Sequence, residues 1–218
     1  MKFHNHPRAL KIRFVIVFLS TFLIIFSLLN ARFLYANVRY FIAPGTIITK
    51  DSLGQATKLL PLSKNLSEKP LPDNAHLVID SIGIDVPIIF GVSTEENTIY
   101  KNLEKGVVHY STTVKPGELG TALILGHSSA YPWYKGKYGS VFALLGKLKP
   151  GDKFYVQYKD KRLFVYEVKR TVVFNPFGDG LILDQLESNP KPNLILVSCW
   201  PVGTAYRRIA IQAEPVGI

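Results

Sequence analysis

From His76 onward the chain alternates short apolar runs with Gly, Pro and Asp, a pattern typical of β-strands joined by tight turns. The runs that we expect to form strands are 77–82, 86–90, 122–125, 153–158, 163–174, 194–198 and 208–213. Helical signals are fewer, and we expect short helices at 94–104, 141–148 and 181–187. Many short strands in series predict a mainly β domain, folded as a closed or nearly closed barrel of about eight strands.

An uncharged apolar run, residues 14–29, lies near the N-terminus. Basic residues precede it: Lys2, Arg8, Lys11 and Arg13. With Asn30 and Ala31 the run approaches the length of about 20 residues that crosses a bilayer. The positive-inside rule then predicts a single-pass membrane anchor with its N-terminus in the cytoplasm. A cleavable signal peptide is the alternative, although no clean small-x-small cleavage motif follows the run.

We expect four segments: a cytoplasmic basic tail at 1–13, a transmembrane anchor at 14–35, a stalk or linker at 36–75, and an extracytoplasmic domain at 76–218. The stalk contains an amphipathic piece at 38–48 and a later stretch interrupted by prolines. The formal net charge is +10, but the basic residues are scattered and no nucleic-acid-binding motif accompanies them. We therefore expect no nucleic-acid partner, and the charge favours an anionic membrane or cell wall.

Cys199 is the only cysteine of the chain and directly follows the apolar run 194–198. It has no partner for an intramolecular disulfide, whereas exported proteins usually use cysteine in pairs. It is therefore either an inert core thiol or a residue kept for chemistry. Two further reactive groups stand at the ends of apolar runs: His127 after 121–126, and the pair Arg207 and Arg208 before 209–211. Together these groups suit a thiol-based acyl-transfer site built on a β-sheet.

The segment Ile195-Leu-Val-Ser-Cys199 resembles the nucleophile motif of the sortase family, Thr-Leu-x-Thr-Cys. Leu196 and Cys199 match the motif, Ser198 replaces threonine conservatively, and Ile195 departs from it. Leu125-Gly126-His127 is similar to the apolar-Gly-His motif of the family, and an arginine heads the last apolar run as in sortases. The motifs occur in the family's order over residues 77–213, behind an expected membrane anchor. The resemblance implies a sortase-like closed barrel and a membrane-anchored cysteine transpeptidase. It does not assign the chain to one class of sortases.

The resemblance implies a role for each reactive residue. Cys199 would be the nucleophile, His127 the general acid and base, and Arg208 the group that stabilises the oxyanion. Arg207 is the alternative to Arg208, because neighbouring side chains of a strand point to opposite faces. His109 is the competing histidine, and we expect it to support the groove or to lie in a loop.

In family terms, the thiolate cleaves a C-terminal sorting signal resembling Leu-Pro-x-Thr-Gly between Thr and Gly. The substrates would be surface proteins or pilins, transferred through a thioacyl-enzyme to an amine acceptor such as a peptidoglycan precursor or a pilin lysine. We expect no metal and no cofactor, since Cys199 and His127 alone fall short of a zinc site. Some relatives bind calcium through loop carboxylates, but we expect Glu95, Glu96 and Glu104 to be solvated helix charges.

Two other functions are compatible with parts of this pattern. One is a sortase-like barrel that serves as a membrane-anchored binding or assembly module without activity. The other is an exported cysteine enzyme similar to L,D-transpeptidases, whose motif is Ser-His-Gly-Cys. The residues before Cys199 are Leu-Val-Ser, which disfavours the second alternative.

Overall fold

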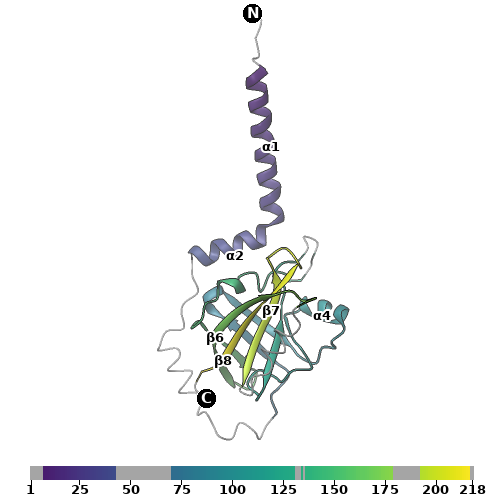
Figure 1. Ribbon diagram of the computed structural model, residues 1–218, viewed down its shortest axis with the longest axis vertical. Coiled ribbons are helices and arrows are strands. Elements are labelled where there is room, and N and C mark those ends of the chain that lie inside the picture. The colour runs from purple at the N-terminus through teal and green to yellow at the C-terminus, as the bar shows by residue number, and fades with distance from the viewer. Residues whose placement is uncertain (1–6, 43–69, 131–133, 135, 179–191, 217–218) are drawn as a thin grey trace, which may run out of the picture.

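The structure is a computed structural model that describes residues 7–42, 70–130, 134, 136–178 and 192–216. Within these residues the core of the protein is a closed barrel with the strand order β1-β2-β3-β4-β7-β8-β6-β5 (Figure 1). The strands are β1 (Ala75–Ile79), β2 (Ile84–Ile89), β3 (Val107–His109), β4 (Thr121–Leu125), β5 (Lys153–Tyr158), β6 (Leu163–Phe174), β7 (Asn193–Trp200) and β8 (Arg207–Pro215). The predicted mainly β, eight-stranded barrel is thus confirmed.

The predicted strands correspond to barrel strands, with ends that differ by a few residues. The run expected at 77–82 is divided, because β1 ends at Ile79 and a 3₁₀ turn, Asp80–Ile82, follows it. Gly83 closes that turn in the left-handed conformation, at φ 66°. The sequence pattern does not predict β3, which at three residues is too short for a two-residue alternation to be visible.

The expected helix at 94–104 is present as α4 (Glu96–Leu103). The expected helix at 141–148 is wrong, because the chain there forms successive turns and one 3₁₀ segment, Leu145–Lys147. Its backbone bonds join residues three apart, and the N–H of Phe142 instead donates to the carbonyl of His127 at 2.8 Å. A tertiary contact has therefore replaced local helix formation. The third expected helix, at 181–187, lies outside the described residues.

Two helices precede the barrel. The first, α1 (Pro7–Leu29), contains the stretch Lys11–Leu29, whose length and composition suffice to cross a membrane. The second, α2 (Ala31–Ile42), runs across the end of α1 (Figure 1). It covers the first part of the segment expected as a stalk, and the rest of the amphipathic piece, 43–48, lies outside the described residues. The barrel begins at Ala75, and Leu71 already packs into its core.

Strand β7 is buried on both faces. Leu194 and Leu196 point into the main barrel core, whereas Ile195 and Val197 belong to a second apolar cluster on the outer face. Burial on both faces explains why the run is almost continuously apolar in the sequence. Because side chains alternate along a strand, the row of Ile195 and Val197 continues to Cys199 on the outer face of the barrel.

A buried hydrogen bond ties the turn before β4 to the barrel. The hydroxyl of Tyr158, a residue only 2% exposed, donates to the carbonyl of Pro116 at 2.8 Å. We predict that Tyr158→Phe lowers the free energy of unfolding by about 1 to 2 kcal/mol, because the buried carbonyl loses its donor. The measurement is urea unfolding of the full chain in detergent, followed by tryptophan fluorescence.

Tyr206→Phe is the matched control, since Tyr206 is 73% exposed. It is expected to change the free energy of unfolding by less than about 0.5 kcal/mol. Equal midpoints for the two variants would show that the Tyr158 hydroxyl does not stabilise the barrel.

Candidate active site

The pairing of β7 brings the predicted site residues to one end of the barrel. On one side β7 runs parallel to β4, with Leu125 opposite Val197, and the N–H of Gly126 donates to the Val197 carbonyl at 3.1 Å. On the other side β7 is antiparallel to β8, with Cys199 directly opposite Arg208. His127 follows β4 at the same end, so thiol, imidazole and guanidinium converge although they lie far apart in sequence.

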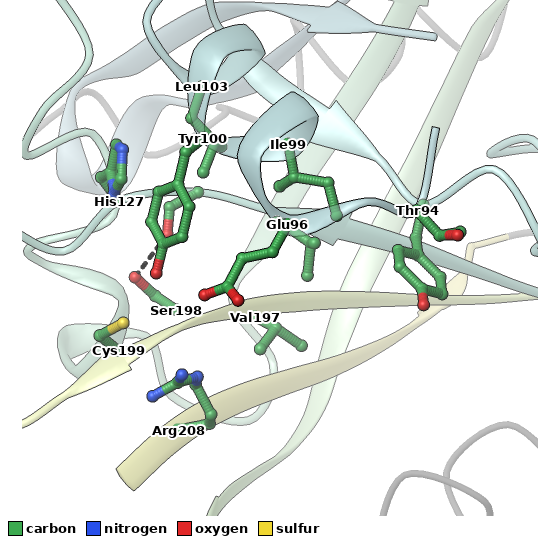
Figure 2. A pocket seen from close by; sticks show the side chains of 13 residues that line it. Thr94, Glu96, Ile99, Tyr100, Leu103, His127, Val197, Ser198, Cys199 and Arg208 are labelled. Carbon is green, nitrogen blue, oxygen red and sulfur yellow. Dashed lines mark hydrogen bonds between the residues drawn. The ribbon is translucent and has the colours of Figure 1, made fainter. Parts of the chain in front are cut away.

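These three residues line one pocket of about 230 Å³ (Figure 2). One wall comes from α4 and from Thr94, which lies two residues before it. The floor comes from the ends of β4, β7 and β8. The complete lining is Thr94, Glu96, Ile99, Tyr100, Leu103, Tyr110, Leu125, Gly126, His127, Val197, Ser198, Cys199 and Arg208. A pocket that is mostly apolar, with a few converging reactive groups, is typical of a ligand or substrate site.

His127 lies between two aromatic rings. Tyr100 of α4 stacks on the imidazole with the centroids 5.9 Å apart, and Tyr134 meets it edge-on at 5.5 Å. The Tyr134 hydroxyl donates to the Leu103 carbonyl at 3.0 Å, which ties this ring to α4. Burial lowers the pKa of His127 below the ordinary value of 6.5, and the negative charge of Glu104 opposes that shift more weakly. The site therefore favours a neutral imidazole that can accept a proton.

Hydrogen bonds fix the strand ends that carry His127 and Cys199. The hydroxyl of Ser198, which is buried, donates to the carbonyl of Gly126 at 2.7 Å, as the dashed line in Figure 2 shows. On the other side of Gly126, the carbonyl of His127 accepts the N–H of Phe142. The two residues before the imidazole and the thiol are thereby held to one another.

Of the two adjacent arginines, the structure places Arg208 in the pocket. Ile209 and Ile211 of β8 point into the barrel core, and Ala210 points to the outer face. By alternation Arg208 shares that outer face with Cys199. Its guanidinium donates to the carbonyl oxygens of Ala205 and Arg207, at 2.9 and 3.1 Å, which restrains the side chain.

Arg207 is exposed and lies over the Tyr206 ring at 5.7 Å. Cys199, in contrast, is a half-buried free thiol at the pocket floor.

The aromatic loop after His127 contributes Tyr134 to the site, while 131–133 and 135 lie outside the described residues. Trp200 is half-buried and packs against the main barrel core.

The competing histidine, His109, does not line this pocket. It is buried in β3, where its Nε2–H donates to the Val114 carbonyl at 2.8 Å and its ring lies 5.2 Å from that of Phe90. Burial also lowers the pKa of His109, and the hydrogen bond that its ring donates to the Val114 carbonyl opposes the shift. His109 is thus a buried residue of the barrel that lies outside the pocket.

Tyr100 and Glu96 are among the pocket residues that were not identified from the sequence. Glu96 is exposed, as expected of a solvated helix charge, and it also lines the pocket. No sequence signal separates it from Glu95, the preceding residue. Within the described segments, no group of three or more His, Cys, Asp or Glu side chains is placed to hold a metal ion.

Comparison with known proteins adds to this geometry. The family described as "Sortase domain" matches residues 77–216. Sortase D of Bacillus subtilis (strain 168) is 30% identical over 175 residues, which cover 77% of this chain and 74% of the relative. Sortase SrtE1 of Streptomyces coelicolor is 26% identical over 153 residues, which cover 65% of this chain and 40% of the relative. The crystal structure of sortase C-1 from Actinomyces oris has a TM-score of 0.53 at 26% identity, covering 81% of this chain and 89% of that chain.

The burial of His127 leads to a prediction about the pH at which its imidazole is protonated. We expect its imidazole, followed by NMR, to titrate with a midpoint below 6.5, and we expect Tyr100→Ala to move the midpoint toward 6.5 by admitting water. Folding lowers the pKa of His127. The stability that the neutral imidazole contributes is therefore present above about pH 6.5, and it is lost as the pH falls toward the pKa of the folded state. A midpoint at or above 6.5 in the folded chain would contradict the effect of burial.

A second prediction concerns Gly126, which precedes the imidazole. A Cβ at this position would overlap the ring of Phe142, a core residue only 1% exposed. We expect Gly126→Ala to lower the free energy of unfolding by about 1 to 3 kcal/mol through overpacking. At Gly178, a Cβ would meet its nearest atom at 3.7 Å, so Gly178→Ala serves as the control. Equal urea midpoints for the two variants would show that the contact with Phe142 does not constrain the chain before His127.

Proposed function

The chain belongs to the sortase family of cysteine transpeptidases, and on that premise we propose that Cys199, His127 and Arg208 form its catalytic site. The observation that supports the proposal most is the register of β7 and β8, which sets Cys199 opposite Arg208, together with His127 in the same pocket. A non-enzymatic module of the same fold has no need to bring these three groups together.

In the first proposed step, His127 takes the proton of the Cys199 thiol, and the resulting thiolate attacks the carbonyl carbon of the Thr-Gly bond in a Leu-Pro-x-Thr-Gly-like signal. The sulfur–carbon bond forms, the C–N bond breaks, and the departing amine takes a proton from His127. Arg208 donates hydrogen bonds to the carbonyl oxygen as negative charge develops on it. The product is a thioacyl-enzyme on Cys199.

In the second proposed step, an amine attacks the thioacyl carbon. His127 accepts a proton from the amine, and the sulfur of Cys199 leaves as the carbon–sulfur bond breaks. The substrates are surface proteins or pilins that carry a C-terminal signal. The acceptor is an amine such as that of a peptidoglycan precursor or a pilin lysine.

We also propose that α1 anchors the enzyme in the cell membrane with residues 1–13 in the cytoplasm. Residues 14–35 would form the anchor, 36–75 the link to the barrel, and 76–218 the extracytoplasmic catalytic domain. The basic residues before the apolar stretch support this orientation, and the length and composition of Lys11–Leu29 support the span.

The experiment that tests the function is mass spectrometry of the full chain in detergent, mixed with a pool of sorting-signal peptides and an amine. We expect a thioacyl adduct on Cys199 and an amine-linked product, both absent with Cys199→Ala. Folded parent protein that forms neither adduct nor product with any peptide would contradict the proposal and favour a binding module.

The two arginines provide a matched pair for the oxyanion role. We expect Arg208→Ala to lower kcat/KM for peptide cleavage by about 100-fold, because a donor to the developing charge is lost. Arg207→Ala removes the same charge one residue away, outside the pocket, and should change kcat/KM by less than about twofold. A larger loss with Arg207→Ala than with Arg208→Ala would reverse the assignment.

A further inference from the structure

The pocket contains one carboxylate that the proposed mechanism does not use, that of Glu96. Glu96 is the first residue of α4 and comes from the wall opposite the strands that carry Cys199 and Arg208. Figure 2 shows its side chain extending toward the pocket floor, on the side where Cys199 and Arg208 lie. Because Glu96 is exposed at the wall of the pocket, its carboxylate can interact with a charged group that enters from solvent.

The neighbouring carboxylate shows that this placement is specific. Glu95 does not line the pocket, and its carboxylate instead accepts a hydrogen bond from the Thr98 hydroxyl at 3.1 Å, at the start of the same helix. Two adjacent glutamates thus carry the same charge in different places. Only Glu96 faces the reactive groups.

The charges of the pocket make this carboxylate useful for one substrate in particular. Arg208 is a fixed positive charge, and burial favours the neutral form of His127. An amine acceptor reaches the enzyme mostly as an ammonium ion, which Arg208 repels. Glu96 is the acidic side chain among the lining residues, so it is the group in the pocket that can attract an ammonium.

We propose that Glu96 is a specificity-determining residue for the acceptor, whose ammonium group its carboxylate binds before transfer. The inference rests on the proposed transpeptidase function and extends it to the second substrate. It predicts that the enzyme binds the acceptor in its charged ammonium form. A neutral nucleophile would gain nothing from this carboxylate.

The chemistry of the step is balanced by groups already in the pocket. The ammonium held by Glu96 gives one proton to the imidazole of His127 and becomes a nucleophilic amine. Its nitrogen then bonds to the thioacyl carbon, the carbon–sulfur bond breaks, and the electron pair returns to sulfur. The second proton of the nitrogen passes to the Cys199 sulfur. An amide, a thiol and an imidazolium result, and the carboxylate is unchanged.

The test is the partition of one thioacyl-enzyme between amine and water. The full chain in detergent is acylated with a sorting-signal peptide, and amide and hydrolysis products are measured against acceptor concentration. This ratio is independent of the rate of acylation. The acceptors are glycinamide, which is mostly an ammonium at neutral pH, and hydroxylamine, which is mostly uncharged.

We expect Glu96→Gln to lower the amide-to-hydrolysis ratio with glycinamide by about tenfold, because the variant loses a charged hydrogen bond to the ammonium. With hydroxylamine the ratio should stay within about twofold, because a neutral acceptor feels little of a fixed charge. Glu95→Gln, the matched control, should leave both ratios unchanged, and Glu96→Asp should retain more of the glycinamide ratio than Glu96→Gln. Added salt should lower the glycinamide ratio of the parent more than that of Glu96→Gln.

Two results would overturn the inference while leaving the transpeptidase function intact. One is an unchanged glycinamide ratio in Glu96→Gln. The other is an equal fall with glycinamide and hydroxylamine, which would indicate a change in pocket shape. If the parent formed no adduct on Cys199 with any signal peptide, the proposed function would fail and this inference with it.

Discussion

The pairing of β7 on both of its edges is the constraint on which the site depends. Its parallel register with β4 sets the distance along the barrel at which His127 emerges, and its antiparallel register with β8 sets Arg208 opposite Cys199. A slip of one residue in either register would turn the affected side chain to the other face. The burial of β7 on both faces stabilises that register, because a slip would move Ile195 and Leu196 out of their clusters.

The surroundings of the three reactive groups then adjust their chemistry. The rings of Tyr100 and Tyr134 bury the imidazole and favour its neutral form, while the backbone at Ala205 and Arg207 restrains the guanidinium of Arg208. The bond from Ser198 to Gly126 joins the two strand ends from which thiol and imidazole project. Positioning groups before the reaction in this way is the main means by which a site stabilises charge as it develops.

Much of this arrangement could be predicted from the sequence, for physical reasons that differ between residues. Cys199 and His127 end apolar runs long enough to be recognised as strands, so their placement at strand ends follows. The choice between Arg207 and Arg208 needs one further fact, namely that Ile209 and Ile211 face the core. Glu96 could not be identified, because only the packing of α4 against β3 distinguishes its position from that of Glu95. The composition of residues 141–148 favours a helix. The hydrogen bond from the Phe142 N–H to the His127 carbonyl competes with the backbone hydrogen bonds that a helix would need there.

The central claim is that Cys199, His127 and Arg208 act on one carbonyl group. The most direct measurement is a crystal structure of the full chain with a sorting-signal peptide analogue covalently bonded to the sulfur of Cys199. The account predicts that the carbonyl oxygen of the analogue accepts a hydrogen bond of about 3 Å from the Arg208 guanidinium, with the His127 ring facing the sulfur. A carbonyl oxygen directed away from Arg208, with His127 turned from the adduct, would contradict it.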